Sequence, residues 1–183
     1  MRKTFTELRN EFFKSFPDPS TDQIDGGRLY DLIQDVLDTL QPAYGVLSTI
    51  GAPISGTIGT SPVLVPWELK YWETAPEFVV NQAAGSITFT RPSGVVRITL
   101  TIDIGVAVNR ALEFTIFANG VATPWRMQIT GTGVTKPDAV GLVAILNPAV
   151  PTTYTIMASA DQANTAAEFS NAVFVVENVP VGA

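Results

Sequence analysis

The sequence contains neither cysteine nor histidine. The absence of cysteine excludes disulfide bonds and thiol chemistry. The absence of histidine removes the commonest general base and the usual transition-metal ligand. Charged residues are also scarce, at 15% of 183 residues, against about a quarter in a typical soluble protein. Threonine, serine, asparagine and alanine must therefore supply much of the surface, which is compatible with large contacts between proteins.

Long hydrophobic runs are missing too, since no stretch approaches the roughly 18 to 20 apolar residues of a membrane span. The formal net charge of -6 argues against a surface for nucleic acid or anionic membrane. Glu7 and Glu11 stand where a signal peptide would need an apolar run. We therefore expect synthesis in the cytosol without an export signal, no nucleic-acid partner and no membrane partner.

Motifs for catalysis are also lacking. Gly131-Thr132-Gly133 has neither the further glycine nor the following helix of a phosphate-binding loop, and no Gly-x-Ser-x-Gly elbow occurs. The acidic residues Glu68, Glu73, Glu77, Asp103 and Glu113 leave open a carboxylate pair for glycoside hydrolysis. Most of them occupy polar positions of alternating strands, which favours a solvated outer face, and Asp161–Asn164 has too few acids for calcium. We expect no enzymatic activity, no metal and no cofactor.

Alternation of apolar and polar residues dominates the chain after about residue 62. From Val95 to Ile104 every second residue is apolar, beginning at Val96 and ending at Ile104, with Arg97, Thr99, Thr101 and Asp103 between them. A strict period of two is typical of a strand with one face on a core and the other in water. This stretch therefore predicts a long, half-buried strand.

Seven further strands are predicted around this one. They are 63–72, 86–91, 112–118, 125–129, 140–146, 154–160 and 172–176. Asn119-Gly120 between two apolar runs predicts a hairpin with a type I′ turn, and Pro66 and Pro124 suggest edge strands or bulges. Short strands separated by turn residues predict a mainly β antiparallel sandwich or barrel and exclude a parallel α/β sheet.

Two of the predicted strands, 140–146 and 172–176, are apolar on both faces. Such a strand is either central in its sheet or buried against another chain. We take the second faces as candidate contacts with other subunits, made by Val143, Ile145, Val173 and Val175.

Residues 1–45 predict a helical anchor. A first helix over about 4–16 carries Phe5, Leu8, Phe12 and Phe16 at helical spacing, and Pro17 ends it. A second helix presents one apolar stripe formed by Leu29, Leu32, Ile33, Val36, Leu37 and Leu40. This stripe either covers the β domain of its own chain or packs against copies of itself or a docking surface. We favour the latter, because residues 46–62, rich in glycine and proline, predict an extended linker before a β domain at 63–183.

Aromatic residues offer a possible binding surface. Trp67, Tyr71 and Trp72 cannot share one strand face, since their spacing mixes both parities, which favours burial in the core or a subunit interface over a carbohydrate cleft. Trp125, on the predicted return strand of the hairpin, is the candidate glycan contact.

The helical segment Asp25–Leu40, followed by Pro42-Ala43-Tyr44-Gly45 and a small β domain, resembles virion accessory proteins of tailed bacteriophages. The β half resembles the trimeric jelly rolls of the tumour-necrosis-factor-like superfamily, through segments 112–120, 154–160 and 169–176. The resemblance implies a jelly-roll β-sandwich and a homotrimeric capsid decoration or short head-fibre protein. It further implies attachment to the major capsid protein or another virion protein, and location in the virion. A tail-associated protein that binds a receptor or host-surface glycan is the alternative.

Overall fold

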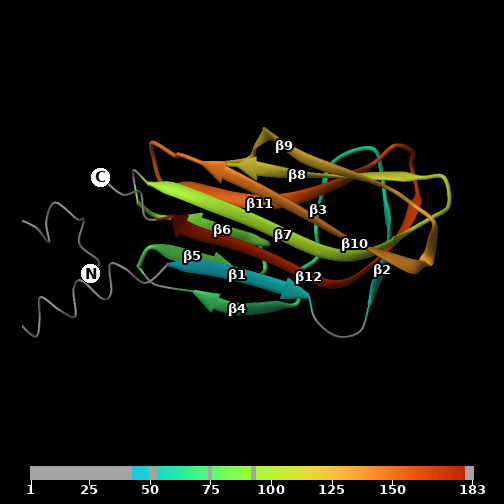
Figure 1. Cartoon of the computed structure of the whole chain (residues 1–183), viewed down its shortest axis with the longest axis horizontal. Helices are drawn as coiled ribbons and strands as arrows, with labels where there is room; N and C mark the ends of the chain where they lie inside the picture. The colour runs from blue at the N-terminus through green and yellow to red at the C-terminus, as the bar shows by residue number, and fades with distance from the viewer. Residues whose placement is uncertain (1–42, 50–52, 74–75, 92–93, 180–183) are drawn as a thin grey trace, which may run out of the picture. The chain divides into compact units, whose positions relative to one another are not determined.

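The computed structural model describes residues 43–49, 53–73, 76–91 and 94–179, and within these ranges every regular element is a strand. Ala43–Val179 forms one compact unit, which we call the β domain (Figure 1). The predicted helices and all their apolar anchor residues, from Phe5 to Leu40, lie outside the described residues. No helix among the described residues is long and apolar enough to cross a membrane.

The β domain consists of two antiparallel sheets. The first sheet has the order β10-β7-β12-β1-β4, and β2 also pairs with β12. Its strands are β1 (Tyr44–Thr49), β2 (Ile54–Ile58), β4 (Leu69–Glu73), β7 (Val95–Val106), β10 (Gly133–Leu146) and β12 (Thr165–Val179). The second sheet has the order β5-β6-β11-β8-β9, and β3 also pairs with β11. Its strands are β3 (Val63–Leu64), β5 (Phe78–Asn81), β6 (Ser86–Phe89), β8 (Ala111–Ala118), β9 (Val121–Thr130) and β11 (Thr152–Ala160).

The chain passes repeatedly between the two sheets. It leaves the first sheet after β7, forms β8 and β9 in the second, returns for β10, crosses for β11 and returns for β12. Strands distant in sequence therefore become neighbours, as when β12 lies between β7 and β1. This arrangement of two sheets with crossing connections is a jelly roll, and the prediction of a mainly β jelly-roll sandwich is confirmed.

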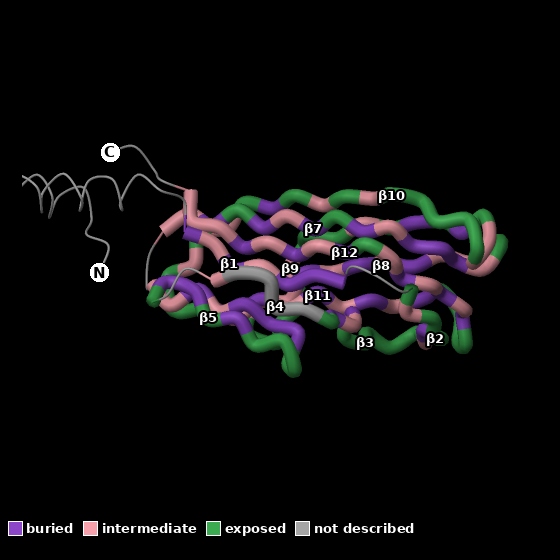
Figure 2. The backbone as a smooth tube through the Cα atoms, turned by 90° about the horizontal axis from the view of Figure 1, so that it is seen from below, coloured by how far each residue is buried: buried purple, intermediate pink, exposed green. Residues whose placement is uncertain are grey.

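The core lies between the two sheets (Figure 2). Alternate residues of β7 face inward, and Ile98 and Leu100 are fully buried, because the period of two sends every second side chain to the same face. Phe114 of the second sheet and Phe169 of the first meet edge to face, with ring centroids 6.3 Å apart. The core therefore draws on side chains from both sheets.

Several local predictions are confirmed. The long strand predicted over 95–104 is β7, and Asn119-Gly120 connects β8 to β9 with positive φ angles of 49° and 77°. Pro124 lies in β9, which is an edge strand. The two-faced segment 172–176 lies in β12, in the interior of the first sheet.

The linker prediction is wrong. Most of residues 46–62 form β1 and β2, which pair with β12, and Leu47 is fully buried. Gly45, in β1, is a core position, because a Cβ there would lie 2.7 Å from Cγ2 of Ile87. The β domain therefore begins at Ala43, well before residue 63.

Two further strand predictions need correction. Segment 63–72 is not one strand, because the chain leaves β3 in the second sheet and crosses to β4 in the first, with Pro66 in the crossing. Segment 140–146 is not central, because β10 is the edge strand of the first sheet. Contact with another chain, the other explanation for its two apolar faces, stays a prediction.

Candidate subunit interface on the outer face of the first sheet

The candidate site is built on the outer face of β7, the face that points away from the core. Between the buried residues Ile98 and Leu100, Thr99 points outward, as do Arg97 and Thr101 on either side. β7 pairs with β10 on one side and β12 on the other, so each of these residues marks the centre of a row across three strands.

The register brings all four predicted contact residues onto this outer face. Thr99 lies opposite Val143 of β10 and Val175 of β12, and Thr101 lies opposite Val173. Ile145 lies opposite Arg97, one row further along. Since neighbouring strands are about 4.8 Å apart, Val143 and Val175 lie about 10 Å from each other across Thr99. We call the group Val143, Ile145, Val173 and Val175 the apolar patch.

The apolar patch has two parts that differ in exposure. Val143 and Ile145, on the edge strand β10, are 54% and 59% exposed. Val173 and Val175, on the interior strand β12, are half-buried. Val46 of β1 pairs with Val175 and extends the patch to a fourth strand. Apolar side chains therefore run from an exposed edge toward the middle of the sheet.

One ion pair lies at the margin of the patch. Nε of Arg97 donates a hydrogen bond of 2.6 Å to Oε1 of Glu177. This hydrogen bond, together with the attraction of the carboxylate charge, raises the pKa of Arg97. Because the two charges compensate each other, this row carries no net charge into a contact with another molecule.

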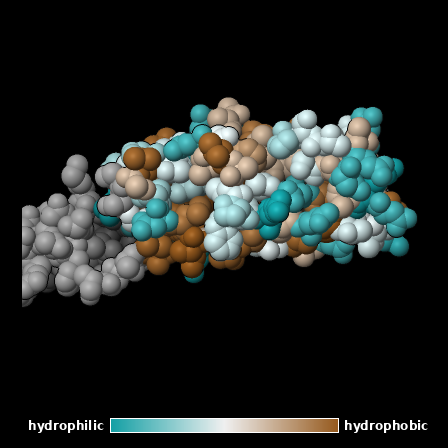
Figure 3. All heavy atoms as spheres, turned by 90° about the horizontal axis from the view of Figure 1, so that it is seen from above, coloured by the Kyte–Doolittle hydropathy of each residue, from teal (hydrophilic) through white to brown (hydrophobic). Residues whose placement is uncertain are grey.

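The polar residues of the same face lie toward its other end. Nδ2 of Asn171 donates a hydrogen bond of 3.2 Å to Oδ2 of Asp103, next to a β-bulge in β12. Glu168 accepts a hydrogen bond from Ser55 of β2. The space-filling view, seen from above relative to Figure 1, shows apolar surface mainly toward its left end and hydrophilic surface mainly toward its right end (Figure 3).

The structure does not bring Trp125 to the apolar patch. Trp125 lies in β9, in the second sheet, and is 38% exposed. Its backbone N–H donates a hydrogen bond of 3.3 Å to Oγ1 of Thr123. Trp67, by contrast, is buried and packs on Phe174 with ring centroids 5.8 Å apart, as expected for a core residue.

The acidic residues considered for hydrolysis are distributed over both sheets. Asp103 lies on β7 and Glu113 on β8, where Glu113 is 3.6 Å from Nη1 of Arg126. Glu68 lies in the crossing between β3 and β4 and is exposed. Among the described residues no group of three or more acidic side chains could hold a metal ion.

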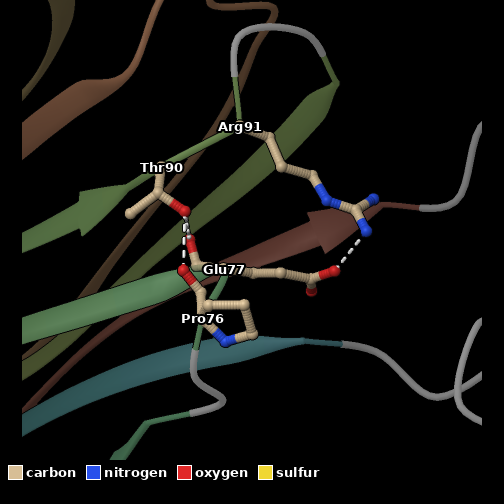
Figure 4. A network of polar contacts seen from close by, with 4 residues as sticks. All are labelled: Pro76, Glu77, Thr90 and Arg91. Carbon is tan, nitrogen blue, oxygen red and sulfur yellow. Dashed lines mark hydrogen bonds and ion pairs between the residues drawn. The ribbon is translucent and has the colours of Figure 1, made fainter. Parts of the chain in front are cut away.

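Glu77 departs from the expectation of a solvated outer face, because its side chain is only 3% exposed. One carboxylate oxygen forms an ion pair with Nη2 of Arg91 (Figure 4). The Glu77 carbonyl accepts a hydrogen bond of 2.9 Å from the N–H of Thr90. Oγ1 of Thr90 also donates to the carbonyl of Pro76, at 2.7 Å. Glu77 therefore joins the start of β5 to the end of β6. This role of Glu77 could not be predicted from local sequence pattern, because its partners Thr90 and Arg91 lie 13 and 14 residues away along the chain.

Comparisons with known proteins do not place the chain in a family. No protein-family model and no curated protein matches the sequence. Among solved structures, Eiger TNF from S. frugiperda matches with a TM-score of 0.48 and 10% identity, covering 77% of this chain and 96% of that one. Murine APRIL matches with a TM-score of 0.48 and 8% identity, covering 74% of this chain and 99% of that one.

Proposed function

We propose that the chain is a non-enzymatic structural protein of a bacteriophage virion, a homotrimeric capsid decoration or short head-fibre protein. The observation that carries the proposal is the apolar patch, above all the exposed pair Val143 and Ile145 on an edge strand. Two large aliphatic side chains more than half exposed on one strand, continuous with half-buried valines, favour burial against another subunit.

A cyclic trimer needs two different surfaces on each copy, because its interfaces are heterologous. The patch offers two such surfaces, the exposed edge of β10 and the half-buried valines of β12. In the proposed trimer Val143 and Ile145 of one copy pack on the outer face of the next. Burying the exposed half of one such side chain stabilises the contact by about 1 kcal/mol, and the three-fold arrangement repeats each contact three times.

The assignment to a phage particle is supported by the chain's organisation. Residues 1–45 hold a cluster of charges and two predicted amphipathic helices, and this segment resembles virion accessory proteins. The β domain begins at Ala43, at the C-terminal end of this segment. In the proposal the N-terminal segment fastens to the major capsid protein or another virion protein, and the β domain projects from the particle.

Sedimentation equilibrium of the full chain tests the trimer. The expected mass is three times the chain mass of 19.6 kDa. V143D and I145D should each shift the protein toward a folded monomer, because a carboxylate would be buried without a partner. V79D is the matched control, since Val79 is 51% exposed but lies on β5 of the other sheet. A monomeric wild-type protein, or equal effects of all three substitutions, would contradict the proposal.

The virion role has a separate test. Particles of the phage that encodes the chain should contain it in a copy number divisible by three. Electron microscopy should show projections that disappear when residues 1–42 are deleted. Particles that lack the protein, or that retain the projections after this deletion, would exclude the anchoring role.

A further inference from the structure

The β domain has two distinct ends. The chain enters β1 at Tyr44, which pairs with Glu177 near the end of β12, and the N–H of Asn178 donates to the carbonyl of Ala43 at 2.8 Å. The entry and exit of the chain therefore lie at the same end, the left end in Figure 1. The opposite end carries the connections 107–110, 131–132 and 161–164, which we call the tip loops.

Hydrogen bonds join the tip loops to one another and to the sheets. The N–H of Asn109 donates to the carbonyl of Gly131 at 3.2 Å, and the N–H of Gly131 donates to the carbonyl of Arg110 at 2.7 Å. Ala111 and Asp161 are joined twice, at 3.0 Å each, once between backbone groups and once through Oδ1 of Asp161. A surface held in this way loses little conformational entropy when it binds a ligand.

Two asparagines in the tip loops occupy backbone positions that favour glycine. Asn109 and Asn164 both have φ of 58°, in the left-handed region, and both are exposed. The other two asparagines with positive φ use their side chains within the protein: Asn119 Oδ1 accepts from the N–H of Thr153, and Asn171 donates to Asp103. Within the described part of the chain, the side-chain amides of Asn109 and Asn164 make no hydrogen bond.

The chemistry of the tip loops is polar and nearly uncharged. Gln162 and Thr132 add a further amide and a hydroxyl, and both are exposed. The charged residues of these loops are Arg110 and Asp161, and one oxygen of Asp161 is already occupied. Val108, 60% exposed, is the large apolar side chain among them. An amide offers two donors and one acceptor, which suits the neighbouring hydroxyls of a sugar.

We propose that the tip loops bind an uncharged glycan. The amides of Asn109 and Asn164, with Gln162, pair with sugar hydroxyls, and Val108 packs against the apolar face of a ring. The tip loops contain no aromatic residue for stacking, so each site binds weakly. Tight binding to a surface that carries many glycans rests on the proposed trimer, since three sites facing one way bind such a surface more tightly than one site.

The asparagine positions allow a clean test, because glycine deletes the amide while retaining the preferred backbone. Full-length wild type is screened on an array of neutral glycans, and the best binder is then titrated in solution as a soluble monovalent oligosaccharide. N109G and N164G should each weaken monovalent binding about tenfold, corresponding to one lost hydrogen bond. The control N171G, also at positive φ but outside the tip loops, should bind as wild type.

The outcomes separate this inference from the trimer. Monovalent binding that is lost in N109G and N164G supports the tip site even if sedimentation finds a monomer, and in that case only the trimer fails. Three results would overturn the inference: no neutral glycan bound, binding unchanged in the N109G/N164G double variant, or binding only to anionic glycans that disappears with salt.

Discussion

Arg97 and Glu177 form an ion pair across β7 and β12, with 2.6 Å between Nε and Oε1, in the same row as Ile145. This relationship gives a first prediction. E177Q should leave an uncompensated positive charge beside the apolar patch. Because exposed ion pairs add little to the stability of a domain, the melting temperature of the isolated subunit should hardly change. Trimer association should weaken about tenfold, because the contact now buries an unpaired charge.

Sedimentation at several protein concentrations measures this effect. E113Q is the matched control, since Glu113 forms its ion pair with Arg126 on the second sheet. If E113Q weakens association as much as E177Q does, the effect is not specific to the first sheet and the interface assignment is wrong.

The second prediction concerns the start of the β domain. A chain shortened to 43–183 should unfold cooperatively, because it retains β1 and β2. A chain shortened to 62–183 should fail to fold, because it loses Leu47 and Ile58 from the core and leaves β12 without a partner on one side. Chemical denaturation followed by tryptophan fluorescence distinguishes the two. Cooperative unfolding of the shorter chain would restore the view of 46–62 as a linker.

The sequence predicted those parts of the fold that depend on local pattern. β7 followed from its period of two, and the β8–β9 hairpin followed from Asn119-Gly120, whose positive φ angles any isolated turn of this type would need. β1 was missed because glycine and proline residues are typical of turns and linkers when only the local sequence is considered. Gly45 is instead required by packing, since Ile87, Val80 and Phe78 surround the place of its missing side chain.

The candidate interface was predictable in its residues but not in its geometry. Two-faced apolar segments singled out Val143 and Val175, which are 32 positions apart in sequence. That both lie opposite Thr99 follows from the pairing of β10, β7 and β12, and pairing between distant strands leaves no local pattern. For the same reason, the sequence did not predict that β10 is an edge strand or that the tip loops lie together at one end of the β domain.

The third prediction tests the left-handed backbone conformation of Gly120 in the β8–β9 turn. Gly120 has φ of 77°, and a Cβ at this position would have nothing within 4 Å, so G120A introduces strain without a clash. It should lower the free energy of unfolding by about 1 kcal/mol. G56A is the control: Gly56 is equally open but has no positive φ, so this substitution should be neutral or slightly stabilising. Urea denaturation measures both, and equal effects would mean that the hairpin does not depend on its left-handed turn.

The last prediction uses the buried phenol of Tyr154. Burial raises its pKa to about 12, while a hydrogen bond with Thr152 acts in the opposite direction. The pKa of a tyrosine in the unfolded chain is about 10. Between these values the unfolded chain releases the proton and the folded domain retains it. The stability linked to this group is therefore fully present below pH 10 and is lost as the pH rises toward 12.

At pH 11 the loss should reach about 1.4 kcal/mol. Y154F should remove this component, so urea midpoints of the two proteins should converge between pH 8 and pH 11. Parallel pH curves for wild type and Y154F would show instead that Tyr154 ionises equally easily in both states.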